Sequence, residues 1–152
     1  MRLRTIETLL RLARQAEDRA RVEARGRRKA LDDSTRLSHT LRLYAGEYSD
    51  QLVANGVGGN ATADELDRQS AFKRKLDRTR IEQSGVIDNN QASYNAAIEF
   101  VSQNQMRTRI FEGLESRARA AVKRRAERAE QAVLDDLVNS RRNFESSGTE
   151  GA

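Results

Sequence analysis

The residues of this chain that could support catalysis or metal binding are few, and their spacing does not favour either chemistry. The only histidine is His39, with Ser38 and Thr40 beside it, and the sequence has no cysteine. Asp and Glu are numerous but scattered among arginines, as is usual for solvent-exposed helix faces. No Ser/His/Asp arrangement, Walker loop or zinc-ligand spacing occurs. The sequence therefore predicts no catalytic residue, no metal site and no cofactor, and a protein that is not an enzyme.

The glycine-rich segment 55–60 is the one place where a phosphate-binding loop could be considered. It contains three glycines and two asparagines, but no Lys-Ser or Lys-Thr follows and no strand pattern precedes it. Glycine and asparagine adopt positive φ at low cost, so the segment is typical of a turn. Thr62 and Glu65 then have the spacing of a capping box, in which each side chain accepts a hydrogen bond from the other residue's backbone amide. We expect a turn at about residues 54–62 and a new helix after it.

Small and apolar residues recur at alternating steps of three and four on both sides of this turn, and the chain has no proline. This spacing predicts a narrow coiled-coil seam rather than the wide apolar face of a globular helix. The weaker first seam, interrupted at Glu17, Arg27 and Ser38, contains Leu3, Ile6, Leu10, Ala13, Ala20, Ala24, Leu31, Ser34, Leu41, Tyr48 and Leu52. The second contains Leu76, Arg80, Gln83, Ile87, Asn90, Tyr94, Ala97, Val101, Asn104, Thr108, Phe111, Ala118 and Val122.

The predicted fold is all-α: a long antiparallel two-helix coiled-coil hairpin whose second helix is longer than the first. The expected helices span about residues 3–53 and about 63–143. Residues 1–143 would form a single domain, and the Ser-, Gly- and Glu-rich tail 144–152 would be disordered.

Composition and charge agree with a coiled coil. Hydrophobic residues make up 37% of the chain and charged residues 34%, and there is no Trp. Residues 1–30 contain ten Lys or Arg against four Asp or Glu, and residues 107–142 contain ten against six. A hairpin would bring these two basic segments to the same end. The sequence has no stretch of transmembrane length and no signal-peptide core, so we expect a soluble, cytoplasmic protein.

Two surfaces are candidates for binding other proteins. Near the turn, Tyr44 and Phe72 fall outside the two seams. The aromatic and apolar side chains around them therefore either seal the hairpin or form an exposed binding patch. Folding about Gly58 would put Leu3 near Gly113 and leave residues beyond about 115 unpaired. That segment has an alanine-rich apolar stripe from Ala118 to Val138, and a helix of this kind becomes stable when it docks on a partner. The basic residues flanking the stripe are Arg117, Arg119, Lys123, Arg124, Arg125 and Arg128.

Two short segments flank the turn: Tyr44-Ala45-Gly46-Glu47-Tyr48 before it and Phe72-Lys73-Arg74-Lys75-Leu76 after it. With these segments, a length of about 150 residues, two unequal helices and a basic composition, the chain resembles a family of type III export proteins over nearly its whole length. This is the central-stalk and chaperone-escort family of flagellar FliJ and its injectisome counterpart of the YscO type.

The resemblance implies a stalk that binds the export ATPase hexamer, links it to the cytoplasmic domain of the export gate membrane protein, and handles export chaperones. It implies that the end holding both termini enters the ATPase ring, in agreement with the charge distribution. Leu37, Thr79 and Gln83 depart from the flagellar pattern of the gate-binding patch. The residues that match this patch by position are Leu37, Leu41, Tyr44, Tyr48, Phe72, Leu76, Thr79 and Gln83.

Two other functions remain open at this point. A net charge of +5 and the arginine-rich segment allow nucleic-acid binding. Glutamates alternate with those arginines, however, and no aromatic stacking platform or basic-region-plus-zipper order accompanies them, so we expect no nucleic-acid partner. A generic structural coiled coil is the other alternative, and the sequence does not separate a flagellar from an injectisome protein.

Overall fold

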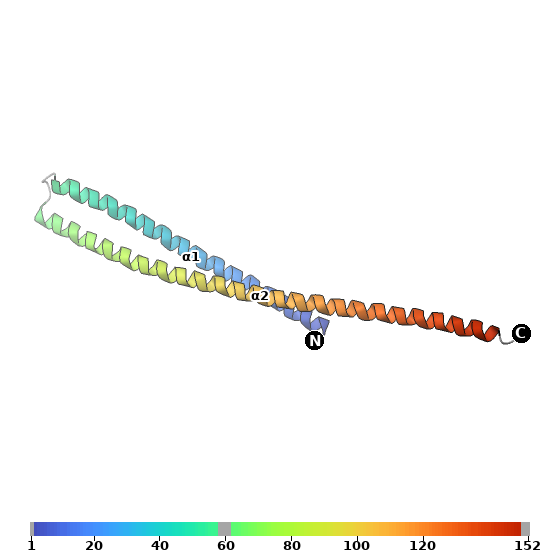
Figure 1. Cartoon of the computed structure of the whole chain (residues 1–152). Helices are drawn as coiled ribbons and strands as arrows, with labels where there is room; N and C mark the ends of the chain where they lie inside the picture. The colour runs from blue at the N-terminus through green and yellow to red at the C-terminus, as the bar shows by residue number, and fades with distance from the viewer. Residues whose placement is uncertain (1, 58–61, 150–152) are drawn as a thin grey trace. The chain divides into compact units, whose positions relative to one another are not determined.

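The computed structural model describes residues 2–57 and 62–149. They form two helices, α1 at Leu3–Val57 and the longer α2 at Ala63–Gly148, which pack against each other (Figure 1). No strand occurs in these two ranges. The predicted all-α helical hairpin with a longer second helix is confirmed.

The helix bounds differ from the predicted ones at two places. α1 ends at Val57 rather than about residue 53, and residues 58–61 of the predicted turn lie outside the described ranges. α2 continues to Gly148, through residues predicted to be disordered. There the hydroxyls of Ser146 and Ser147 donate to the carbonyls of Asn143 and Phe144, both at 3.0 Å, so these side chains satisfy carbonyls of the last turns. Residues 150–152 of the predicted tail are outside the described ranges, and the single-domain assignment stays a prediction.

The start of α2 has the predicted capping box. The Glu65 backbone amide donates to Thr62 Oγ1 at 3.3 Å, and the Thr62 amide donates to Glu65 Oε2 at 3.3 Å. Two of the amides that no helical carbonyl can reach are thereby satisfied.

The chain divides into two compact units, which are described separately. The hairpin unit is Ala16–Asn104, and the terminal unit combines Met1–Gln15 with Gln105–Ala152. Within the terminal unit, Arg14 pairs with Glu112 at 3.4 Å and Glu7 with Arg119 at 2.9 Å. From Glu7 to Arg14 the residue number rises along α1, while that of the paired α2 residue falls from 119 to 112, so the helices run antiparallel there. The same order holds in the hairpin unit, where Tyr48 contacts Gln69 and Ser34 contacts Gln83.

The core is a narrow seam made largely of small residues, as predicted. In the hairpin unit the buried residues include Ala20, Ala24, Leu31 and Ala97, and in the terminal unit they include Ile6. No large side chain of the described residues is fully buried. Almost all predicted seam positions are buried or half-buried, while Arg80 and Val122 are exposed. Arg80 lies 3.7 Å from Asp77 on the surface of α2, where water can solvate both charges.

A polar layer interrupts this seam in the hairpin unit. Asn90 Nδ2 donates to Ser34 Oγ at 3.1 Å, and Gln83 Nε2 donates to the Ser34 carbonyl at 3.1 Å. Ser34 is buried. Because these hydrogen bonds form only in one alignment of α1 with α2, they favour that register over slipped ones.

The pairing is displaced from the predicted one. Arg2 and Leu3 lie beside Ala118, Ala121 and Val122, rather than near Gly113. The prediction folded the chain about Gly58. Because α1 continues to Val57 and α2 begins only at Ala63, the midpoint between the two helices lies later in the sequence, and each α1 residue faces an α2 residue of higher number than predicted. The unpaired part of α2 therefore begins near residue 122, because every residue from 122 to 149 is exposed.

Candidate protein-interaction surfaces

Three aromatic rings meet across the two helices in the hairpin unit, and we call Tyr44, Tyr48 and Phe72 the aromatic cluster. The rings of Tyr48 and Phe72 lie 4.8 Å apart and those of Tyr44 and Phe72 lie 6.5 Å apart, both edge-to-face. The hydroxyl of Tyr48 also donates to the Gln69 carbonyl at 3.5 Å. Edge-to-face pairs are favourable, so each ring limits the orientation of the next.

The aromatic cluster both closes the seam and faces solvent. Tyr48 is half-buried, whereas Tyr44 is 50% and Phe72 40% exposed. Tyr48 therefore helps to close the seam, while Tyr44 and Phe72 are exposed, and their role as a binding patch stays a prediction. An anchored and partly exposed aromatic surface is the kind that carries most of the binding energy in protein interfaces.

The other five residues of the predicted gate-binding patch have different environments. Leu37 is exposed, Leu41 is half-buried, and Leu76 is a core residue at 8% exposure. Thr79 is exposed, but its hydroxyl donates to the Lys75 carbonyl. Gln83 binds the Ser34 carbonyl across the seam. Leu76 and Gln83 thus support the hairpin, and Leu37 is an exposed apolar side chain on α1.

The predicted basic residues all lie on the exposed surface of α2 in the terminal unit. Arg119 alone of the six links α2 to α1: its Nη2 lies 2.9 Å from Glu115 Oε1 and 2.9 Å from Glu7 Oε1. The hydrogen bond and charge of Glu115, followed by the charge of Glu7, raise the pKa of Arg119. Arg124 Nε donates to the Ala120 carbonyl at 3.3 Å. Within the described ranges the other four, Arg117, Lys123, Arg125 and Arg128, form no ion pair.

Beyond these arginines, α2 has an apolar stripe that none of the described residues of the terminal unit covers. Val133, Leu134, Leu137 and Val138 are 56–60% exposed, and Phe144 is 82% exposed. Leu134, Leu137, Val138 and Phe144 border one shallow groove with Arg141. The stripe thus continues to Phe144, past the predicted end at Val138. Phe144 was missed because the sequence placed it in the disordered tail.

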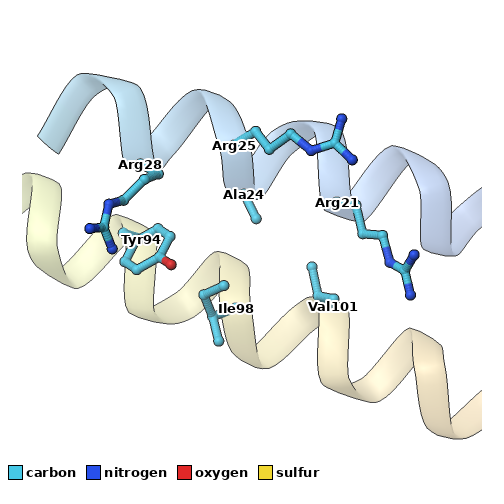
Figure 2. Close-up of a pocket in the computed structure, with 7 residues that line it drawn as sticks. All are labelled: Arg21, Ala24, Arg25, Arg28, Tyr94, Ile98 and Val101. Carbon is cyan, nitrogen blue, oxygen red and sulfur yellow. The ribbon is translucent and has the colours of Figure 1, made fainter. Parts of the chain in front are cut away.

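A hollow in the hairpin unit has no counterpart among the predicted sites. It holds about 330 Å³ and is lined by Arg21, Ala24, Arg25 and Arg28 of α1 and by Tyr94, Ile98 and Val101 of α2 (Figure 2). A signal was present in the sequence, because Arg21, Arg25 and Arg28 are spaced by four and three residues and flank the small seam residue Ala24. It was missed because i,i+4 charge pairs around it are typical of any solvated helix.

The described residues contain no group of three or more His, Cys, Asp or Glu side chains that could hold a metal ion. No helix within the described ranges combines the length and apolarity that crossing a membrane would require.

Comparison with known proteins gives a match to a protein-family model. The family model described as "Flagellar FliJ protein" matches residues 1–146. No curated protein and no solved structure matches the chain.

Proposed function

The chain belongs to the flagellar FliJ protein family, and on this premise we propose that it is the stalk that links the flagellar export ATPase to the export gate and handles export chaperones. Membership makes it a protein of the flagellar export apparatus, and the family is a non-enzymatic component of that apparatus. The partners and the binding residues named below are the proposal.

The aromatic cluster is the observation that carries the assignment of a gate-binding surface. Tyr44, Phe72 and Leu37 expose large apolar groups, while Tyr48 and Leu76 hold the same region to the seam. A partner can cover the exposed rings without α1 and α2 having to rearrange, so little conformational entropy is lost on binding. We propose that the cytoplasmic domain of the gate membrane protein binds this surface and contacts its exposed residues directly, while its buried and half-buried residues hold the surface in place. The full set is Leu37, Leu41, Tyr44, Tyr48, Phe72, Leu76, Thr79 and Gln83.

The basic part of α2 is the proposed ATPase-binding surface. Its exposed cations lie next to an uncovered apolar stripe, so a ring lumen lined by acidic and apolar groups would complement both. The unpaired helix gains its missing apolar cover by docking. The set consists of Arg117, Arg119, Lys123, Arg124, Arg125 and Arg128. By this assignment the protein works in the cytoplasm, has no cofactor and no catalytic activity of its own, and reaches the membrane through the gate.

The gate-binding surface is tested by titrating the purified cytoplasmic domain of the gate against the full chain. The double variant Tyr44→Ala/Phe72→Ala should bind at least about tenfold more weakly, because it removes two exposed aromatic contacts. Helicity should be unchanged, since both rings are about half exposed.

The matched control is Phe100→Ala. It removes a ring that is 54% exposed and that lies on α2, like Phe72, but outside the aromatic cluster. It should bind the gate domain like the parent chain. Equal weakening by both changes, or no weakening by the double variant, would mean that the aromatic cluster is not the gate-binding surface.

A further inference from the structure

The hollow between Ala24 and Ile98 belongs to neither of the surfaces proposed above. We propose that it is a third docking site, which takes an acidic amphipathic helix of a partner protein. The helix would place one aliphatic side chain in the hollow and carboxylates against Arg21, Arg25 and Arg28.

The floor of the hollow is apolar because small and aliphatic residues meet there. Ala24 is a seam residue at 6% exposure, and it points from α1 toward Ile98 and Val101 on α2 (Figure 2). Ile98 is 45% exposed although it lines the hollow. A larger residue at position 24 would fill part of this space. The alanine leaves a hollow of about 330 Å³ with an apolar floor, which is large enough to take an aliphatic side chain of a partner.

The rim of the hollow is cationic on one side only. Arg21, Arg25 and Arg28 come from α1, and the three α2 residues that line the hollow carry no charge. The three arginines span residues 21–28 of α1, about two helical turns, so one partner helix with carboxylates at steps of three and four could reach them all. The groove between two packed helices is also where a third helix packs by ridges and grooves.

Within the described ranges, Arg21 and Arg28 form ion pairs with carboxylates of α1, and Arg25 does not. Arg21 pairs with Glu17 at 2.6 Å, while Arg28 lies 3.3 Å from Asp32 and 5.4 Å from the centre of the Tyr94 ring. A hydrogen bond with Tyr94, followed by the charge of Asp32, raises the pKa of Arg28. Arg25 has no ion pair within the described ranges. The unpaired Arg25 leaves the rim with a charge for a partner to neutralise, and the pairs on either side limit where its neighbours point.

The same features favour a peptide over a nucleic acid. Grooves that bind single-stranded nucleic acid combine cations with aromatic faces on which successive bases stack. Tyr94 is the only aromatic side chain that lines the hollow; it is half-buried and has the Arg28 guanidinium over its ring. The remaining floor is aliphatic, and aliphatic floors bind aliphatic side chains.

The test is a selection of displayed helical peptides of about 20 residues, a length that supports an isolated helix. Peptides are selected on the full-length chain after depletion on the Arg25→Glu variant. We expect survivors with acidic residues at steps of three and four around one aliphatic residue. Their affinity should fall about tenfold for Arg25→Glu and for Ile98→Ser.

Matched controls separate the site from general charge and hydrophobicity. Arg19→Glu makes the same charge change on the opposite face of α1, and Ile81→Ser removes an exposed isoleucine (74% exposed) that lines a different hollow. Both should bind the selected peptides like the parent. Replacing by lysine only the peptide carboxylate that faces position 25 should restore binding to Arg25→Glu, because the charges of that one pair are then exchanged.

Several results would overturn the proposal. One is that no peptide survives the depletion, and another is that the survivors show no acidic pattern. A third is that they bind all four variants equally. Short single-stranded DNA and anionic lipid vesicles are measured in parallel. Binding of either that depends on Arg25 more strongly than peptide binding does would assign the site to that class instead.

Discussion

Leu76 and Phe72 lie four residues apart on α2 and have opposite environments. Leu76 is buried at 8% exposure, while Phe72 is 40% exposed and contacts both tyrosines of α1. Their positions relative to the seam predicted this difference in part, because Leu76 is on the seam register and Phe72 is not. How far the rings of Tyr48 and Phe72 would close over the seam depends on side-chain packing, which the spacing of residues does not determine.

This difference gives a stability prediction at the residue scale. Leu76→Ala should lower the free energy of unfolding by about 2 kcal/mol, the low end for a buried leucine because the seam is narrow. Leu43→Ala, at a site 56% exposed in the same unit, should change it by less than about 0.5 kcal/mol. Urea denaturation followed by circular dichroism measures both. Similar losses at the two sites would contradict the assignment of Leu76 to the core.

At the scale of elements, the helices and their caps follow from local sequence. The Thr62–Glu65 capping box, the glycine-rich turn and the three-and-four spacing predicted the start of α2 and the pairing of two helices. The pairing offset was wrong by several residues because it depends on where α1 stops, and Gly56 and Val57 continue the helix. Helix ends of this kind are decided by small energies, so sequence patterns locate them only approximately.

The capping box gives the second stability prediction. Thr62→Ala should destabilise the chain by about 1 kcal/mol, because it leaves an amide of the first turn without its acceptor. Glu65→Ala should act through the same pair, so the double variant should lose less than the two single losses added together. Thr40→Ala, at an exposed position inside α1, is the control and should have little effect. Additive losses at Thr62 and Glu65 would show that the two side chains do not act as one cap.

At the scale of the whole molecule, each unit carries a different surface. The hairpin unit has the aromatic cluster, and the terminal unit has the basic, uncovered part of α2. The sequence predicted both surfaces through charge counts and seam registers. It did not predict the hollow at Ala24, because a cavity arises from the sizes of side chains on two helices once their register is set. Basic residues of α1 and α2 meet in the terminal unit, where the ion pairs of Arg14 and Arg119 with glutamates of the facing helix offset part of their repulsion.

The central claim is that one chain joins the export ATPase to the export gate. Its most direct test is size-exclusion chromatography of the ATPase hexamer and the gate's cytoplasmic domain, with and without the full chain. We predict that the gate domain co-elutes with the hexamer only when the chain is present. Tyr44→Ala/Phe72→Ala should release the gate domain alone, and Arg124→Glu/Arg125→Glu/Arg128→Glu should release chain and gate domain together from the hexamer. If the ATPase instead displaces the gate domain from the chain, the two partners share one surface and the linking function is contradicted.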